Sequence, residues 1–444
     1  MAQYSTPSAC FNDTDIAIVG AGIIGVACAL SLRRRGLRVL VMDRQEPGKG
    51  ASYGNAGHMA TEQIFPVADA MILKRLPGML MNPMGPLRLD WKYLPQALPW
   101  FTRLLLNLRP EPYRASVAGI RALNEASIAA WRRLLSSIGG SHLLKDDGSM
   151  LVFEQSESAA AIDVLQRRMA EHGIPVERWQ RESVAAAAPQ LSSHILGGLF
   201  FPATGHVVDP YRVIDALVVA AKKEGVIFSQ EEVISGRITD AGVSLKTEKR
   251  QVDADRVLIA CGAHSASLTA ELTGKHVPLD TERGYHLMLP REIGRLPFAV
   301  TSLERRFIMT PMETGLRLGG TVEFAGLVRP PNMQRAWQLH RLSQGLFDTD
   351  LDIEEATPWM GFRPSLPDSL PIIDRVADGR VMLAFGHHHL GLTQAAITAE
   401  LITRLACAES SSVTQEGPSL RPYQLERFGQ GRCRTRVGKS IRDR

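Results

Sequence analysis

The apolar positions of this 444-residue chain fall into patterns that predict alternating strands and helices. Near the N-terminus, the apolar run at residues 16–19 leads into a glycine-rich turn and then into an Ala- and Leu-rich stretch of helical character. A second apolar run follows and ends at the acidic residue Asp43. Short buried runs separated by a helical stretch are typical of a β-α-β unit with parallel strands.

The spacing of polar and small residues in this unit suits a dinucleotide. Gly20 permits a tight turn, Gly22 lets the backbone approach a pyrophosphate, and Gly25 lets the helix pack close to the strand. The start of the helix offers free N–H groups and the positive end of its dipole to phosphates. Asp43 lies about 20 residues further on, where a carboxylate accepts hydrogen bonds from a ribose.

Later segments continue the alternation, with β-rich stretches between the helices. The pattern predicts helices at residues 116–138, 158–174, 211–225 and 333–347, and a final strand, Gly/His loop and long helix at 380–406. Strands are expected at 148–154, within 226–260 and across 276–324. Proline interrupts residues 64–114 repeatedly, which predicts short helices joined by proline turns.

Nucleotide-domain signals therefore occur at the start, the middle and the end of the chain. This order predicts an α/β fold in which a doubly wound, Rossmann-like domain is discontinuous and carries an inserted β-sheet-rich domain. The nucleotide-binding domain would comprise residues 14–60, 206–275 and 358–429. The inserted domain, expected to bind the substrate, would comprise 61–205 and 276–357, with flexible tails at 1–13 and 430–444.

Composition is that of an ordinary globular protein, with 45% hydrophobic and 22% charged residues and a formal net charge of +5. The five cysteines are odd in number, scattered and without metal-site spacing, which suits a reducing compartment. We expect no secretory signal and no membrane-spanning run, and therefore a cytoplasmic protein. No nucleic-acid motif accompanies the basic C-terminal tail.

The loop and helix that follow residue 385 favour a flavin over a nicotinamide. A reduced flavin carries negative charge near N1 and the C2 oxygen, which a helix N-terminus stabilises. In FGHHHLGLTQAA, Gly386 and Gly391 permit close approach, and Thr393 is expected to cap the helix.

Five motifs in a fixed order extend from residue 15 to about residue 406, namely IAIVGAGIIG, ASYGNAG, VLIACGAHS, WMGFRPSLPDSLPII and FGHHHLGLT. With them the chain resembles the FAD-dependent D-amino acid oxidase/dehydrogenase family, and within it the bacterial D-amino acid dehydrogenases. The resemblance implies a doubly wound FAD domain and a β-sheet substrate domain over one face of the flavin.

The resemblance also implies the cofactor contacts. Gly20, Gly22 and Gly25 would hold the pyrophosphate and Asp43 the adenosine ribose, with Arg44 a further contact. The remaining expected contacts are Ser52 and Asn55 toward the pyrophosphate and flavin, Val233 at the adenine, Gly262 along the dinucleotide, and Gly391, Leu392 and Thr393 at the flavin N1–C2=O edge. The chain departs from the family pattern at His388, where relatives commonly have a small residue.

Arg363, in GFRP, is the expected anchor for the substrate carboxylate, because relatives carry their carboxylate-binding arginine in this context and a guanidinium forms two parallel bonds to a carboxylate. Tyr285 and His286 begin a predicted strand, whose alternation places one of them on the pocket face. We favour Tyr285, whose hydroxyl would share the carboxylate.

Two features invite other chemistry. His58 suggests a covalent flavin–histidine link, but the resemblance favours non-covalent FAD. The three consecutive histidines suggest a metal, but adjacent residues point in different directions and no acidic or Cys partner stands at ligand spacing, so no metal is expected.

We therefore expect an FAD enzyme that oxidatively deaminates a small D-amino acid, with cyclic D-imino acids such as D-proline or D-hydroxyproline included, and passes electrons to a quinone or carrier. A glycine- or sarcosine-type amine oxidase that uses oxygen and a non-catalytic FAD-binding redox subunit remain alternatives. Residues 64–108 mix Leu, Met and Trp with Arg and Lys, which suits either a lid or peripheral contact with the cytoplasmic face of the inner membrane.

Overall fold

The computed structural model describes residues 14–66, 85, 87–407 and 417–429. One sheet has the strand order β10-β2-β1-β14-β21-β20. Its members are β1 (Ile16–Val19), β2 (Val39–Asp43), β10 (Ile227–Gln230), β14 (Arg256–Ile259), β20 (Ile372–Val376) and β21 (Val381–Phe385). All neighbouring pairs are parallel except β20 and β21. Strands from the start, middle and end of the chain thus form one sheet, and the predicted α/β fold class is confirmed.

Both faces of this sheet are covered, which explains why its strands are continuous apolar runs. On one face pack α1 (Ile23–Arg33), α7 (Pro210–Lys223), α10 (Ala395–Cys407) and the long helix α4 (Pro110–Ser136). On the other lie α8 (Ser265–Thr273) and a three-stranded sheet of β11 (Val233–Thr239), β12 (Gly242–Thr247) and β13 (Gln251–Ala254).

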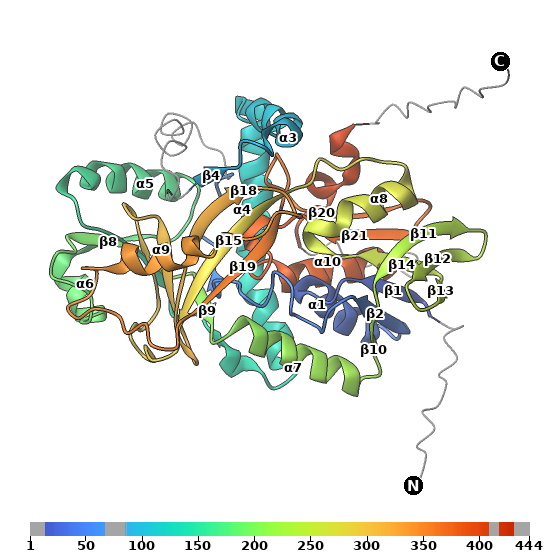
Figure 1. Ribbon diagram of the computed structural model, residues 1–444, viewed down its shortest axis with the longest axis horizontal. Helices are drawn as coiled ribbons and strands as arrows, with labels where there is room; N and C mark the ends of the chain where they lie inside the picture. Colours follow the sequence, from blue (N-terminus) through green and yellow to red (C-terminus); the bar gives the residue numbers. More distant parts are fainter. Residues whose placement is uncertain (1–13, 67–84, 86, 408–416, 430–444) are drawn as a thin grey trace, which may run out of the picture.

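A second large sheet has the order β19-β15-β18-β17-β16-β6-β8-β7, with β4 paired to β18. Its strands are β4 (Leu87–Leu89), β6 (Ser149–Phe153), β7 (Glu177–Gln180), β8 (Gly197–Phe201), β15 (Asp280–Leu289), β16 (Ala299–Ser302), β17 (Phe307–Met312), β18 (Gly315–Phe324) and β19 (Thr357–Ser365). Helices α5 (Ala159–Glu171), α6 (Arg181–Ala187) and α9 (Gln334–Ser343) accompany it. Figure 1 shows this part on the left and the parallel sheet with α1 and α10 on the right.

A small sheet of β3 (His58–Met59), β9 (Gly205–Val207) and β5 (Leu144–Lys145) brings together residues from three stretches of the chain. Short 3-10 turns complete the structure at η1 (Ser141–Leu143), η2 (Ser156–Ser158), η3 (Gly262–His264), η4 (His388–Leu390), η5 (Arg421–Tyr423) and η6 (Leu425–Phe428). None of the helices in the described ranges combines the length and apolar character needed to cross a membrane.

The structure corrects two predictions of local organisation. Strand β19, which the sequence placed in the nucleotide-binding part, pairs in antiparallel register with β15 and so belongs to the second sheet. In the described part of the proline-broken segment, residues 94–107 form a 14-residue helix, α3 (Leu94–Asn107), with Pro99 inside it, and α4 begins at Pro110. Proline is tolerated in the first turn of a helix because no intrahelical partner is lost there. Residues 67–84 and 86 of that segment, and the predicted tails, lie outside the described residues.

The close packing of α1 on β1 generates a stability prediction. A Cβ at Gly25 would stand 1.9 Å from the carbonyl oxygen of Gly20, which is backbone and cannot rotate away. Gly25→Ala should therefore lower the free energy of unfolding by about 2–3 kcal/mol in urea titrations. Ser31→Ala in the same helix is the matched control, because its side chain is half-buried and makes no tight contact. Equal stability of the two variants would contradict this account of the turn.

Candidate functional site

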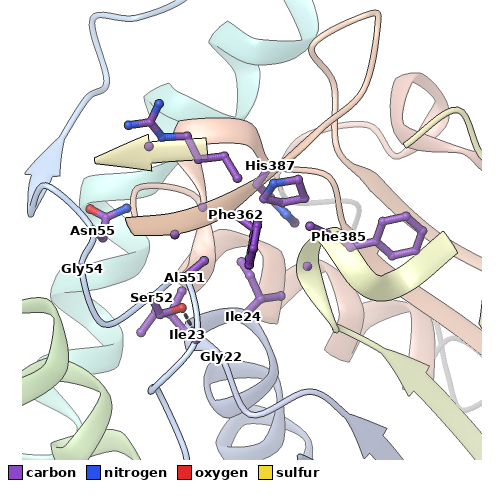
Figure 2. A pocket seen from close by; sticks show the side chains of 18 of the residues that line it. Gly22, Ile23, Ile24, Ala51, Ser52, Gly54, Asn55, Phe362, Phe385 and His387 are labelled. Atoms are coloured by element: carbon purple, nitrogen blue, oxygen red, sulfur yellow. Dashed lines mark hydrogen bonds between the residues drawn. The ribbon is translucent and has the colours of Figure 1, made fainter. Parts of the chain in front are cut away.

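The two large sheets enclose a cavity of about 1460 Å³. The carboxyl ends of β1, β2 and β14 form one wall, and residues of β15, β18, β19 and η4 form the other. In Figure 2, Gly22, Ile23 and Ile24 lie on one side of the cavity and Phe362 and His387 on the other. Ligands of open α/β sheets bind at the carboxyl ends of the strands, and this volume exceeds the 300–1,000 Å³ range of ordinary small-molecule pockets.

The N-terminus of α1 opens onto this cavity. Gly20 has φ +110°, and a Cβ there would lie 2.4 Å from the Ala260 carbonyl oxygen. Gly22 is the N-cap and offers no side-chain bond, so the hydroxyl of Ser52 accepts the Ile23 N–H at 3.1 Å instead. Figure 2 shows this bond between the loop and the helix. The close backbone and the absence of bulky side chains in this turn suit a pyrophosphate, and the Ile23 N–H is already bonded to Ser52.

The residues expected at the adenosine end also line the cavity. One carboxylate oxygen of Asp43 accepts the Ala21 N–H at 2.7 Å, and the other accepts the Gln45 N–H at 2.9 Å. These bonds hold Asp43 at the end of β2 and leave acceptor sites on both oxygens. Further lining residues from the prediction are Arg44, Val233 and Gly262, the last with φ +55° and open space around it.

Two hydrogen bonds, one within the loop and one from Arg317, fix the loop that carries Asn55. The Asn55 side-chain oxygen accepts the Gly57 N–H at 2.9 Å, and its carbonyl accepts a bond from Arg317 at 2.7 Å. Arg317 is buried and paired with Asp209 at 3.3 Å. Asn55 thus lines the cavity from a loop anchored to the second sheet.

Two α4 side chains that the sequence analysis did not identify hold the loops around the cavity. The Asn124 amide donates to the carbonyls of Ala60, Thr61 and Gln63 at 3.2–3.3 Å. The Trp131 indole N–H donates to the Leu392 carbonyl at 2.9 Å, and also reaches the next carbonyl at 3.1 Å. Only their buried positions on one face of an amphipathic helix could have indicated them, and that pattern equally describes ordinary core residues.

The prediction for Thr393 requires correction. Gly391 and Leu392 line the cavity, but Thr393 is fully buried behind them. Its hydroxyl accepts the Ala60 N–H at 3.1 Å and so joins the two loops. Of the three residues predicted at the flavin edge, Gly391 and Leu392 are those that line the cavity.

The three consecutive histidines make different contacts. His387 is hydrogen-bonded to Thr398 of α10 at 3.0 Å, and burial lowers its pKa to about 3. His389 is half-buried at the cavity wall, and burial together with the charge of Arg363 lowers its pKa to about 4. Both rings are therefore neutral near pH 7. His388 turns toward the second sheet.

His58 is buried at the cavity with both ring nitrogens engaged. Nδ1 lies 3.0 Å from the Gly205 carbonyl oxygen and Nε2 lies 3.0 Å from a Glu62 carboxylate oxygen. Burial alone would lower the pKa of His58, but the Glu62 charge raises it above its usual value. The geometry gives this ring a structural ion pair and supports the expectation of non-covalent flavin.

Arg363 lies on β19 with its half-buried side chain at the cavity. Its guanidinium rests on the backbone of Gly284, where a Cβ would come within 2.4–2.8 Å of three of its atoms. It donates to the Thr321 carbonyl at 3.4 Å and forms no ion pair with any described residue. Burial lowers its pKa, but an arginine stays charged at neutral pH. The cavity thus presents an unpaired cation.

Tyr285 and His286 both line the cavity, and the preference for Tyr285 as the partner of the substrate carboxylate stays a prediction. The Tyr285 hydroxyl donates to a Glu323 carboxylate oxygen at 2.6 Å and accepts the Asn332 N–H, although the residue borders the cavity. His286 is the residue of the pair that points toward the first domain: its Nδ1 lies 2.9 Å from the Gly54 carbonyl, and its ring stacks on Trp359. The alternation of side chains along a strand predicted that Tyr285 and His286 lie on opposite faces of β15, but it did not predict the partners of either side chain. Arg283, two residues before Tyr285 on β15, is buried and donates to backbone carbonyls.

The fold and the cavity are typical of a dinucleotide-binding oxidoreductase. Comparison with known proteins agrees with this class. A family model described as FAD dependent oxidoreductase (DAO) matches residues 15–405, and the chain belongs to this family. It is 32% identical over 421 residues to a D-amino-acid oxidase of Bradyrhizobium diazoefficiens, covering 93% of this chain and 98% of that protein. It is 27% identical over 422 residues to a D-amino acid dehydrogenase of Vibrio vulnificus, covering 91% and 99%. The solved glycine oxidase of Geobacillus kaustophilus shares the fold, with a TM-score of 0.67, 22% identity and coverage of 93% and 98%.

Family membership confirms FAD as the cofactor and oxidoreduction as the activity. The residues present also fit the group. Gly22 and Ser52 shape the start of α1, Asp43 ends β2 with free acceptor sites, and Gly391 and Leu392 form a turn without bulky polar side chains. Individual contacts of these residues with FAD stay predictions.

The position of the Arg363 guanidinium over Gly284 leads to a binding prediction. Gly284→Ala should push the guanidinium out of place and raise the Kd of acetate for the FAD-loaded protein about tenfold, because a charged bidentate contact depends on geometry. Binding would be followed by the change in flavin absorption. Gly140→Ala is a glycine control outside the cavity, because Gly140 has a negative φ and a Cβ there meets only side-chain atoms of Leu143 and Ile138. An unchanged acetate Kd in Gly284→Ala would show that the guanidinium does not bind there.

Proposed function

We propose that this flavoprotein oxidises the α-carbon of a small D-amino acid. The observation that carries the proposal is the unpaired guanidinium of Arg363 in the cavity that Gly391 and Leu392 also line. Relatives of similar length named D-amino-acid oxidase and D-amino acid dehydrogenase support the choice of substrate. Cyclic D-imino acids such as D-proline and D-hydroxyproline fall within the proposed class.

The residues of the chain bind and orient the substrate. Arg363 holds the carboxylate through two parallel hydrogen bonds, which fixes the direction of the Cα–H bond. His389, neutral and at the cavity wall, accepts a hydrogen bond from the amine and keeps it oriented. Bound FAD supplies the hydride acceptor, its N5 atom. The resulting imino acid hydrolyses to a 2-oxo acid and ammonia, except where the substrate is cyclic.

Anaerobic flavin reduction tests this proposal directly. D-amino acids should bleach the flavin absorption while their L-enantiomers leave it unchanged, and glycine and sarcosine in the same panel test the amine oxidase alternative. No bleaching by any amine would favour a non-catalytic FAD subunit.

Arg363→Ala should raise the apparent KM for the fastest D-amino acid about 100-fold while FAD stays bound, because the substrate carboxylate loses its charged partner. Arg237→Ala is the matched control, since that arginine is exposed on β11. The measurement is steady-state kinetics with an artificial electron acceptor. A KM within about twofold of the native value would remove Arg363 from the substrate site.

We further propose that electrons leave to a quinone or carrier at a membrane surface. The observation behind it is the α3 apolar face, by which we mean three leucines of α3 and the preceding Trp91, each 48–57% exposed: Trp91, Leu98, Leu105 and Leu106. The helical spacing of the three leucines places them on one side of α3. Basic residues accompany this face, namely Lys92, Arg103 and Arg109. Apolar side chains with flanking cations suit the interface of an anionic bilayer.

Co-sedimentation with phosphatidylcholine/phosphatidylglycerol vesicles tests the α3 apolar face. The native protein should sediment with the vesicles, and Leu98→Glu with Leu105→Glu should lower the bound fraction at least about tenfold, since each change removes buried apolar area and adds repulsion. Ile234→Glu with Ile238→Glu, at exposed isoleucines of β11, is the matched control. Absence of vesicle binding by the native protein, together with fast reoxidation by oxygen, would contradict the proposal.

A further inference from the structure

A carboxylate stands directly across the sheet from the proposed substrate anchor. Glu282 of β15 and Arg363 of β19 are register partners in an antiparallel pair, so their side chains lie on the same face. Opposite charges at such positions ordinarily form an ion pair. An ion pair here would occupy the guanidinium that the substrate carboxylate needs.

The structure shows the two groups turned apart. The Ser365 hydroxyl donates to a Glu282 carboxylate oxygen at 2.5 Å, and the same oxygen lies 3.6 Å from Nδ1 of His388. Glu282 is 2% exposed, whereas Arg363 is half-buried at the cavity. No ion pair within 4 Å joins Arg363 to Glu282 or to any other described residue. Both residues border the cavity, but the Glu282 carboxylate is bonded to Ser365 and not to the guanidinium.

His388 is the residue that connects this group to the FAD-side loop. Its Nε2 accepts the Leu366 N–H at 3.0 Å, which assigns the ring proton to Nδ1. That Nδ1 lies 3.0 Å from the Ser365 oxygen. His388 donates to Ser365, and Ser365 donates to Glu282, so both donors are aligned toward the carboxylate and polarise each other.

The backbone at His388 has an unusual conformation. Its φ is +53°, in the left-handed region that favours glycine, yet the ring is buried between η4, β15 and β19. Residues in strained conformations persist where the surroundings impose them, and they concentrate at functional sites. A glycine would remove this strain but would leave the Ser365 hydroxyl without the His388 donor that supports its bond to Glu282.

The charges around the group are consistent with this arrangement. Burial would raise the pKa of Glu282, but the bonds with His388 and Ser365 and the nearby Arg363 hold it at about 2. The carboxylate is thus ionised and would be attracted to any cation within reach. It is satisfied where it lies, because a buried charge with hydrogen-bond donors needs no further partner.

We propose that His388 and Ser365 act as a clamp on Glu282 that keeps its carboxylate away from Arg363 and so leaves the guanidinium unpaired for the substrate. The clamp rests on the proposed function, because it matters only if Arg363 binds the substrate carboxylate. His388 is a positioning residue in this scheme: it never touches the substrate.

The clamp makes a distinctive prediction about a double variant. In His388→Gly, Glu282 should turn to Arg363 and raise the acetate Kd of the FAD-loaded protein about tenfold or more. Adding Glu282→Gln should restore acetate binding to the value of Glu282→Gln alone, because a neutral amide cannot compete for the guanidinium. A purely structural role of His388 would leave the loss of binding unchanged in the Glu282→Gln background.

Two further variants keep the test informative. His388→Asn should bind acetate almost as the native protein does, because asparagine tolerates positive φ and offers both an acceptor and a donor. Ser365→Ala should repeat the loss and the rescue if His388→Gly does not fold. FAD content and thermal stability are recorded for each variant.

The outcomes separate the clamp from the proposed function. If Arg363→Ala leaves the acetate Kd unchanged, the proposed anchor itself is wrong. If Arg363→Ala abolishes acetate binding while His388→Gly binds normally, or loses binding that Glu282→Gln fails to restore, the anchor stands and the clamp is overturned.

Discussion

The site depends on keeping a positive charge unpaired inside a largely buried cavity. Arg363 gains by any contact with an anion, and a carboxylate lies opposite it on the neighbouring strand. The fold separates them with short-range contacts: Gly284 provides a flat surface for the guanidinium, while donors from Ser365 and His388 hold Glu282. A guanidinium that is already positioned loses little entropy when a ligand carboxylate arrives, so pre-organisation favours binding.

Close backbone packing also determines the geometry on the cofactor side of the cavity. Gly20 and Gly25 let β1, β14 and α1 approach to backbone contact, which leaves the helix N-terminus exposed at the cavity. The side chains of Asn124 and Trp131 on helix α4 hold two of the loops that border the cavity. Several separated stretches of the chain therefore line the cavity, and α4 fixes two of its loops.

The strand, glycine and helix order at residues 16–43 could be predicted because each element depends on local pattern and on glycine sterics. The family and FAD followed from motifs, and the comparisons confirm both. The hydrogen-bond partners of the Tyr285 and Thr393 hydroxyls could not be predicted, because strand alternation and capping preferences do not identify distant partners such as Glu323 and Ala60. The Glu282–Ser365–His388 group could not be predicted at all, since it arises from strand register between distant segments. In the sequence, only His388, which stands where relatives commonly have a small residue, indicated that this place is unusual.

The most direct measurement is a crystal structure of the FAD-loaded protein with a non-reactive carboxylate such as acetate bound. The account predicts that the acetate oxygens lie within hydrogen-bond distance of the Arg363 guanidinium, with Glu282 still bonded to Ser365. A structure in which Glu282 pairs with Arg363, and acetate binds elsewhere or not at all, would contradict it.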